Sequence, residues 1–481
     1  MAKWPYIGRM EMSAGHLARL VEVPPDARPY YRALAAAVRD RILDGRLPVR
    51  VRMPAERQLA ETLGVSRTTV TTAYDRLRGQ GYLESRQGAG SWSALPDPSS
   101  CLDNPWSKAD DGGLLPLHAA ALPASGFLGE AFAHAGENYH RFTLGLGYDP
   151  VGLPALREAV AKRYTERGLA TRPDQIIVTT GAQQGMHLLM TLLAGPGDPV
   201  LLESPTYPHA IDLARLRSAR IVPVGVPADG RHLDLLVSAV RQSGARLAYL
   251  IPDFHNPTGH LMTADDRAGL VAAARRHDVT VIVDETWAEL AIDDPAQPPP
   301  TAVFDTDGRV ICVGSASKLW WGGLRIGWVR GSAALVRRLA TLRASVDIAS
   351  ALFEQLAVAR LFERIEETRA ERRRILAAAR AALVAALRRE VPEWSFRIPG
   401  GGGSLWVRLD APIATPLAEA AAVAGVRLAP GPWFGVDGTL EGHLRLPFTQ
   451  PPDVLADAVR RIAASRGMVG RRPRASLIPA L

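Results

Sequence analysis

The sequence predicts a multidomain protein in which a small N-terminal α domain with a β-hairpin precedes a large α/β domain. Its 481 residues exceed the size of one ordinary domain. Closely spaced helical patterns fill the first hundred residues, and afterwards helical stretches alternate with short apolar strands, which is typical of a largely parallel sheet. The predicted order is an N-terminal extension (1–27), the helical domain (28–93), a linker (94–113), the α/β domain (114–466) and a basic tail (467–481).

Composition restricts the partners and the compartment. The net charge of +8 and the pI of about 9.7 are compatible with a nucleic-acid partner. Cys101 and Cys312 lie far apart and outside any CxxC or His-rich pattern, so we expect neither a disulfide framework nor a metal site. The N-terminus has no apolar signal core, and no apolar run reaches the roughly 18 to 20 residues of a membrane helix. We therefore expect a cytoplasmic protein without a membrane partner.

Lysine is rare in this chain. Of the 57 basic residues only four are lysine, namely Lys3, Lys108, Lys162 and Lys318. Arginine provides positive charge, but a guanidinium stays protonated and cannot form a Schiff base. A lysine within an ordered apolar stretch therefore suggests amine chemistry, and Lys318 is placed in this way.

The predicted helical domain contains three helices and a hairpin. Apolar residues recur at helical spacing from Pro29 to Leu47, and helical patterns follow over 54–63 and 66–80 with Gly64 and Val65 between them. Two short extended segments then flank a glycine-containing turn over 82–92. A helix, a tight turn and a second helix can place the start of the second helix in a DNA groove. From residue 28 to 92, twelve arginines stand against six acidic residues.

Residues 53–92, "MPAERQLAETLGVSRTTVTTAYDRLRGQGYLESRQGAGSW", resemble the GntR-family winged helix-turn-helix over their whole length. Independently of the resemblance, Ser66 is placed to cap the second helix. The alternative for each single arginine is a solvated basic helix face. The resemblance implies contacts to phosphates or guanine edges by Arg57 and Arg67, approach to the DNA by Thr68 and Thr69, and a wing touching the minor groove at Gln87 and Gly88.

In the α/β domain, Lys318 ends the segment Gly314-Ser315-Ala316-Ser317-Lys318 directly after the apolar strand Val310–Val313. Ligands of parallel sheets bind at the carboxyl ends of strands. A partly desolvated lysine at such a place can add to an aldehyde. Arg325 follows in a glycine-rich segment and can bind phosphate with two hydrogen bonds. Lysine, hydroxyl groups and arginine together indicate a phosphorylated aldehyde.

Three further residues follow predicted strands or their loops. Asp284 ends the run 279–283 and needs a cation or donors, such as a protonated pyridine nitrogen, although it can equally cap the next helix. Asn256 is suited to bind a ring hydroxyl, but a plain turn is as good a local explanation. Tyr207 can stack on an aromatic ring or simply pack in the core.

Taken in order, these motifs resemble the fold-type I pyridoxal-phosphate aminotransferases over residues 114–466. The resemblance implies an internal aldimine at Lys318, a pairing of Asp284 with the pyridine nitrogen, a bond from Asn256 to the ring oxygen and stacking of Tyr207 on the ring. It assigns the substrate or effector carboxylate to Arg445. The phosphate would be held by Gly181, Ala182, Gln183, Ser315, Ser317 and Arg325.

Two positions depart from this pattern. The segment Asp284-Glu285-Thr286-Trp287 lacks the tyrosine that relatives place two or three residues after the aspartate, which favours sensing over fast turnover. The segment near the neighbouring subunit's phosphate reads Gly147-Tyr148-Asp149-Pro150, so a role for Tyr148 across a dimer stays open.

Both halves together resemble the MocR regulators. The resemblance implies pyridoxal 5'-phosphate as cofactor, a small amino compound or the cofactor itself as effector, a head-to-tail homodimer, and a double-stranded DNA operator with paired half-sites. A catalytically active aminotransferase with an accessory helix-turn-helix is the alternative. A scaffold without cofactor is disfavoured by Lys318. The sequence leaves open the effector, the operator and the direction of regulation.

Overall fold

The computed structural model describes residues 12–21, 23–24, 27–43, 47, 51–79, 81–86, 90–94, 113–227, 230, 233–294, 296–436 and 439–469. The chain forms two compact units that divide near residue 110, and each is described by itself. Nearly all of the linker predicted over 94–113 and most of the predicted tail lie outside the described residues.

The N-terminal unit contains one helix more than the sequence patterns predicted. The additional helix lies within residues 1–27, to which the sequence assigned no structure, and its side chains Leu17 and Val21 are buried in the core of the unit together with Leu34 and Val38. This helix is therefore part of the packed domain. The elements are α1 (Ala14–Val21), α2 (Tyr30–Leu43), α3 (Glu56–Leu63), α4 (Arg67–Gly79), β1 (Leu83–Arg86) and β2 (Gly90–Ser93).

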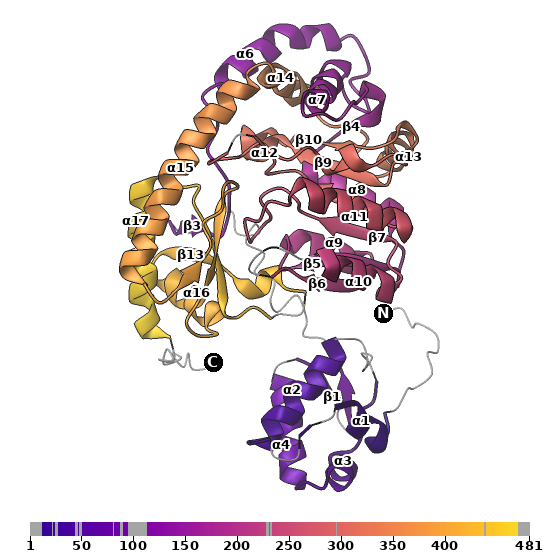
Figure 1. The fold of residues 1–481 in the computed structure, drawn as a ribbon, viewed down its shortest axis with the longest axis vertical. Coiled ribbons are helices and arrows are strands. Elements are labelled where there is room, and N and C mark those ends of the chain that lie inside the picture. Colours follow the sequence, from indigo (N-terminus) through magenta and orange to yellow (C-terminus); the bar gives the residue numbers. More distant parts are fainter. Residues whose placement is uncertain are drawn as a thin grey trace, which may run out of the picture. The chain divides into compact units, whose positions relative to one another are not determined.

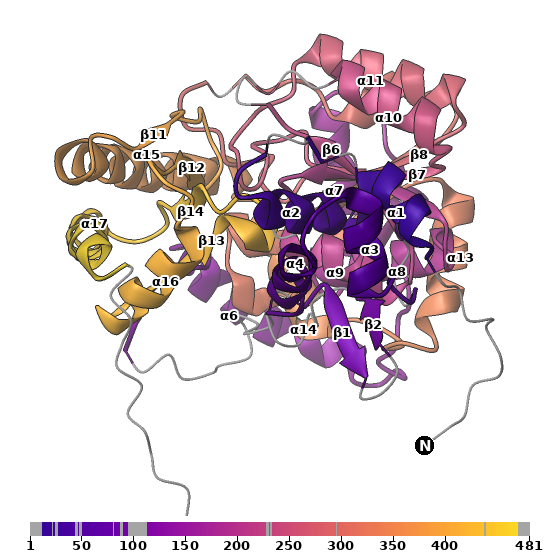
Figure 2. The same ribbon diagram turned by 90° about the horizontal axis from the view of Figure 1, so that it is seen from below.

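The helix-turn-helix has the predicted arrangement. Helix α3 ends at Gly64, whose φ of +67° places it in the left-handed region that glycine adopts without steric cost. Helix α4 begins three residues later, and the hairpin pairs Leu83 with Ser93 in an antiparallel register. Figure 2 shows the β1–β2 hairpin and the helices of this unit. The predicted wing residues Gln87 and Gly88 lie outside the described residues.

The large unit is built on a seven-stranded sheet with the order β4-β10-β9-β8-β7-β5-β6 (Figure 1). All neighbouring pairs are parallel except those of β10, which runs antiparallel to β4 and β9. The two strands predicted over 279–283 and Val310–Val313 agree with β8 and β9 to within two residues at either end. The strands are β4 (Ile176–Thr179), β5 (Pro199–Ser204), β6 (Arg220–Gly225), β7 (Leu247–Leu250), β8 (Thr280–Asp284), β9 (Val310–Ser315) and β10 (Gly327–Arg330).

Apolar side chains bury both faces of this sheet. In β8, Val281 and Val283 belong to one buried cluster, whereas Ile282 between them belongs to another. Successive side chains of a strand point to opposite faces, so the two clusters mark the two faces of the sheet. The same alternation turns Asp284, at the end of β8, towards the face of Ile282.

A smaller sheet of five strands has the order β11-β12-β14-β13-β3. Strand β3, the first element after the linker, pairs in parallel with β13. The long helix α15 (Ile365–Glu390) runs from the larger sheet's helices to the smaller sheet (Figure 1). The strands are β3 (Leu115–Leu117), β11 (Ser395–Phe396), β12 (Ser404–Arg408), β13 (Val426–Pro430) and β14 (His443–Pro447).

Helices cover both sheets of the large unit. Within the described part of the chain, no helix is both long and apolar enough to cross a bilayer. The remaining helices are α6 (Leu128–Tyr139), α7 (Pro154–Glu166), α8 (Ala182–Leu193), α9 (Pro208–Leu216), α10 (Leu233–Ser243), α11 (Ala264–Arg276), α12 (Ala316–Leu319), α13 (Ala333–Arg343), α14 (Leu352–Phe362), α16 (Ala414–Val423) and α17 (Pro452–Ser465).

Candidate functional site

The fold gathers the predicted site residues at the carboxyl ends of neighbouring strands. Asp284 ends β8, Lys318 lies in α12 directly after β9, and Asn256 lies in the loop that follows β7. Strands β7, β8 and β9 are adjacent and parallel, so their ends lie at one edge of the sheet. Arg445, in β14 of the smaller sheet, reaches the same place and donates to Asn256 Oδ1 over 3.3 Å.

Asp284 is held in a fixed orientation by two donors. The Tyr249 hydroxyl donates to Oδ2 over 2.7 Å, and the Thr286 backbone N–H donates to Oδ1 over 2.8 Å. Burial and the neighbouring Asp284 carboxylate raise the pKa of Tyr249 well above its ordinary value, so the hydroxyl keeps its proton. Sequence reasoning missed Tyr249. Its place on β7 in register with Ile282 of β8 was the available signal, because both side chains face the same side of the sheet.

Lys318 has two partners that lie far from it in the sequence. Its amine donates to the Ala120 carbonyl over 2.6 Å and lies 5.2 Å from the centre of the Trp287 ring. Burial, followed by the charge of Arg445, lowers its pKa to about 8, while Asp284 acts in the opposite direction. An amine with this pKa supplies more of the neutral nucleophile at neutral pH than an ordinary lysine does.

Arg445 is a buried cation without an acidic partner. Its Nη1 donates to Asn256, its Nη2 donates to the His118 carbonyl, and the guanidinium lies 4.9 Å from the centre of the Phe434 ring. Nε is buried without a hydrogen-bond partner, and no carboxylate among the described residues forms a salt bridge with this side chain. Burial lowers its pKa to about 10. Such a group gains most from an incoming anion.

The residues predicted to hold the phosphate lie at the start of α8 and close to Arg325. Gly181, with a φ of +79°, precedes the helix, and the first N–H groups of a helix have no partner within it. The positive φ favours glycine at this position, and a Cβ atom there would lie 2.8 Å from Arg325 Nη2, so Arg325 lies close to the start of the helix. Ser315 Oγ accepts from the Ser317 N–H over 3.1 Å and keeps its own O–H as a donor, whereas the partnerless Gln183 Oε1 is an acceptor and cannot bind a phosphate oxygen. The donor groups suit a phosphate.

Tyr207 lies among the charged groups of the site. Its pKa is raised by burial and by the charge of Asp284, and it is lowered by Arg445 and Arg325. The ring contacts His209 edge-on at a centroid distance of 5.2 Å. It therefore lies beside the predicted ring position, where its face is one candidate stacking surface.

The charges of the site fit pyridoxal phosphate. The positive charges of Arg445 and Arg325 and the negative charge of Asp284 act on the Lys318 amine. Among the described residues this leaves an excess of positive charge, which a phosphate and a substrate carboxylate would neutralise. The amine suits the aldehyde, and Asp284 suits a protonated ring nitrogen.

In the N-terminal unit, the predicted DNA-binding side chains divide into two groups. Arg67 and Thr68 are exposed on the first turn of α4. Ser66 Oγ accepts from the Thr69 N–H over 3.1 Å and lies 2.8 Å from its hydroxyl, so these two side chains hold the helix start. Arg57 is exposed and forms an ion pair with Glu61. The arrangement presents Arg67 and Thr68 most directly to a DNA partner.

Comparison with known families assigns both units. Residues 30–92 match the model for bacterial regulatory proteins of the gntR family, and residues 129–462 match the model for class I and II aminotransferases. The fold and site are thus those of a winged-helix DNA-binding domain joined to an aminotransferase-like domain. The second match covers more than half of the chain. The protein belongs to the class I and II aminotransferase family, and its two-domain organisation is that of the MocR-like helix-turn-helix transcription regulators.

Individual relatives include both transcription regulators and aminotransferases. The uncharacterized HTH-type transcriptional regulator YisV of Bacillus subtilis is 30% identical over 79% of this chain and 84% of its own length. The probable rhizopine catabolism regulatory protein MocR of Rhizobium meliloti is 33% identical over 63% of this chain and 65% of its own. LysN, an α-aminoadipate aminotransferase from Thermus thermophilus solved with N-(5'-phosphopyridoxyl)-L-leucine, matches with a TM-score of 0.69 and 28% identity over 75% of this chain and 94% of that one.

Proposed function

We propose that this protein is a pyridoxal-phosphate-dependent transcription regulator that senses a small amino compound and binds an operator with paired half-sites as a head-to-tail homodimer. The cofactor would be linked covalently through the Lys318 amine, held by Asp284 and Asn256, and anchored through its phosphate by the start of α8 and Arg325. When bound, pyridoxal phosphate supplies an aldehyde that exchanges the lysine amine for the amine of another compound. DNA binding places the regulator in the cytoplasm.

The observation that carries this proposal is the unpaired buried guanidinium of Arg445 beside Lys318. An incoming anion would pair with Arg445, and a cofactor bound at Lys318 would exchange the lysine for another amine, which the contacts of Arg445 and the lowered pKa of Lys318 support. A ligand that satisfies both carries a carboxylate and an amine, so an amino acid or a similar compound fits. Sensing requires that the ligand bind one arrangement of the protein better than another.

One segment of the large unit supports a route by which binding reaches the linker. His118 and Ala120 offer their carbonyl groups to Arg445 and Lys318, respectively. A carboxylate at Arg445 and a cofactor on Lys318 compete with both hydrogen bonds. This segment follows β3, the first element after the predicted linker. Loss of the two hydrogen bonds would therefore free the part of the large unit to which the linker is joined.

The exposed loop after α6 supports a homodimer. Leu144, Leu146 and Tyr148 are 97%, 91% and 69% exposed, although large apolar side chains are normally covered. A second copy of the chain would bury them. A dimer also presents two winged helices, as paired half-sites require.

The proposal is tested by the visible absorbance of the purified protein with pyridoxal phosphate, titrated with a panel of amino acids and amines. We expect one compound to shift the spectrum and to change operator affinity without sustained release of keto acid. Absence of any cofactor band would contradict the proposal and favour a scaffold role.

The second candidate is an active aminotransferase that carries an accessory helix-turn-helix. The complete set of Lys318, Asp284, Arg325 and Arg445 favours it, because nothing needed to bind an amino acid is missing. Steady keto-acid production in the same titration, with unchanged operator affinity, would establish this alternative.

Arg67→Ala is expected to weaken operator binding by roughly 1 to 3 kcal/mol if the side chain pairs with guanine. The side chain is exposed on the first turn of α4, where groove contacts are made. Fluorescence anisotropy with operator and random DNA measures the effect. Arg76→Ala, an exposed arginine later in the same helix, is the matched control. Equal weakening on both DNAs would instead make Arg67 a phosphate contact.

A further inference from the structure

We propose that Trp287 is a positioning residue that, together with the Ala120 carbonyl, favours the charged form of the Lys318 amine, against burial and the two arginines, whenever that amine is not bonded to the cofactor. The inference rests on the proposed function, since it concerns what the lysine does after an amino compound has replaced it. It also gives a role to the position at which the chain departs from the aminotransferase pattern.

The geometry supplies two favourable contacts for an ammonium group. The amine donates to the Ala120 carbonyl over 2.6 Å, and the Trp287 ring centre lies 5.2 Å away. A cation within about 6 Å of an indole ring is attracted by its negative face, and tryptophan is the strongest of the aromatic side chains in this respect. Both contacts favour the charged over the neutral amine.

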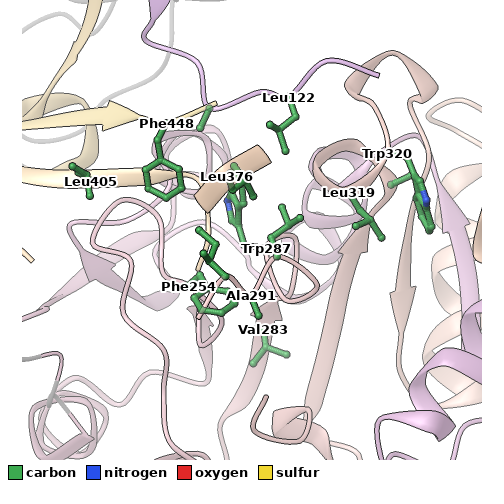
Figure 3. Packing of buried hydrophobic residues seen from close by; sticks show 14 of the residues in the cluster. Leu122, Phe254, Val283, Trp287, Ala291, Leu319, Trp320, Leu376, Leu405 and Phe448 are labelled. Carbon is green, nitrogen blue, oxygen red and sulfur yellow. The ribbon is translucent and has the colours of Figure 1, made fainter. Parts of the chain in front are cut away.

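The Trp287 ring has a fixed position. The side chain is buried in the core cluster drawn in Figure 3. A Cβ atom at Gly403 would lie 2.4 Å from the ring. The backbone just before strand β12 therefore packs directly against the ring. This tight packing restrains the ring in the place where it contacts the lysine amine.

The other charged groups around the amine do not by themselves stabilise its charged form. Arg445 and Arg325 disfavour the ammonium, burial disfavours it further, and only Asp284 among the groups that act on it favours the charge. The ring and the carbonyl thus oppose the burial and the two arginines. A tyrosine would also offer a hydroxyl that can exchange protons, whereas an indole has a single N–H donor and no acceptor.

The consequence concerns turnover. A neutral lysine can accept a proton from a bound amino compound, whereas an ammonium has no free electron pair and cannot. A larger charged fraction of the displaced amine lets the compound bind while it slows the next proton transfer. Such a site reports occupancy of its ligand, as a sensor requires.

The test compares the wild type with Trp287→Phe and Trp287→Leu in the full-length, cofactor-free protein. Competitive acetylation with acetic anhydride over a pH series, read by mass spectrometry, gives the pKa of individual lysines. The chain has four lysines, so the Lys318 peptide is readily assigned, and the exposed Lys162 is an internal control. We expect the pKa of Lys318 to fall in the order Trp, Phe, Leu, by about one unit in total, with Lys162 unchanged.

A pKa of Lys318 that stays the same or rises in both variants would overturn the inference. Trp287→Phe keeps an aromatic ring in the core, so it remains informative if Trp287→Leu fails to fold, as thermal melting would reveal. Failure of the proposed function is distinguishable, because a protein without effector response in the absorbance titration would still show the pKa order. An intact effector response with an unchanged pKa would remove only the role of Trp287.

Discussion

Lys318→Ala is expected to abolish the absorbance band that arises from the bond between Lys318 and the cofactor. Methyl cannot form a bond to the cofactor aldehyde, and the remaining contacts to phosphate and ring hold the cofactor only reversibly. The fold should persist, because the substitution removes a buried cation whose charge is disfavoured by burial and by Arg445. Absorbance before and after dialysis measures the loss, and far-ultraviolet circular dichroism checks the fold.

Lys162→Ala is the matched control for this experiment, since Lys162 is exposed and pairs only weakly with Glu166. Its spectrum should equal that of the wild type. An unchanged spectrum in Lys318→Ala would show that another group binds the aldehyde, and the assignment of the site would be wrong.

Arg445→Ala is expected to weaken effector capture by about 2 to 5 kcal/mol, or roughly 30-fold to several-thousand-fold in affinity, while the cofactor stays bound. The large size follows from burial, because a desolvated guanidinium with an unsatisfied Nε provides most of the attraction for a carboxylate. Titration of the loaded protein with the effector, followed by absorbance, measures the change.

Two further variants sharpen this prediction. Arg445→Lys keeps a positive charge but cannot form bidentate hydrogen bonds to a carboxylate. Its effector affinity should therefore lie between those of the wild type and Arg445→Ala. Arg408→Ala removes an exposed arginine from the neighbouring strand β12 and should change nothing. A normal response in Arg445→Ala would exclude the residue as the carboxylate partner, and loss of the cofactor band would instead show a structural role.

Local patterns were sufficient for much of the protein. The apolar runs of β7, β8 and β9 are recognisable because a strand buried on both faces needs apolar residues throughout. The turn at Gly64 is recognisable because a left-handed residue between two helices favours glycine. Lys318 was identified for a related reason, since it follows a buried strand in a chain with almost no other lysine.

The contacts of the site residues were not accessible in this way. Lys318 and Ala120 are 198 positions apart, and Arg445 and His118 are 327 apart. No periodic pattern relates such residues, because their meeting depends on how β3 pairs with β13 and where β14 lies. The same holds for Tyr249 as the donor to Asp284 and for Trp287 beneath the lysine.

The sequence by itself determined the two domains, their order and the main strands, and it supplied the lysine that we propose binds the cofactor, because these depend on short-range periodicity and residue type. Only the tertiary structure decided that α1 belongs to the N-terminal core and that the two buried cations share one backbone segment. Those features arise from packing between distant parts of the chain, where side-chain burial and hydrogen bonding are settled jointly by the whole fold.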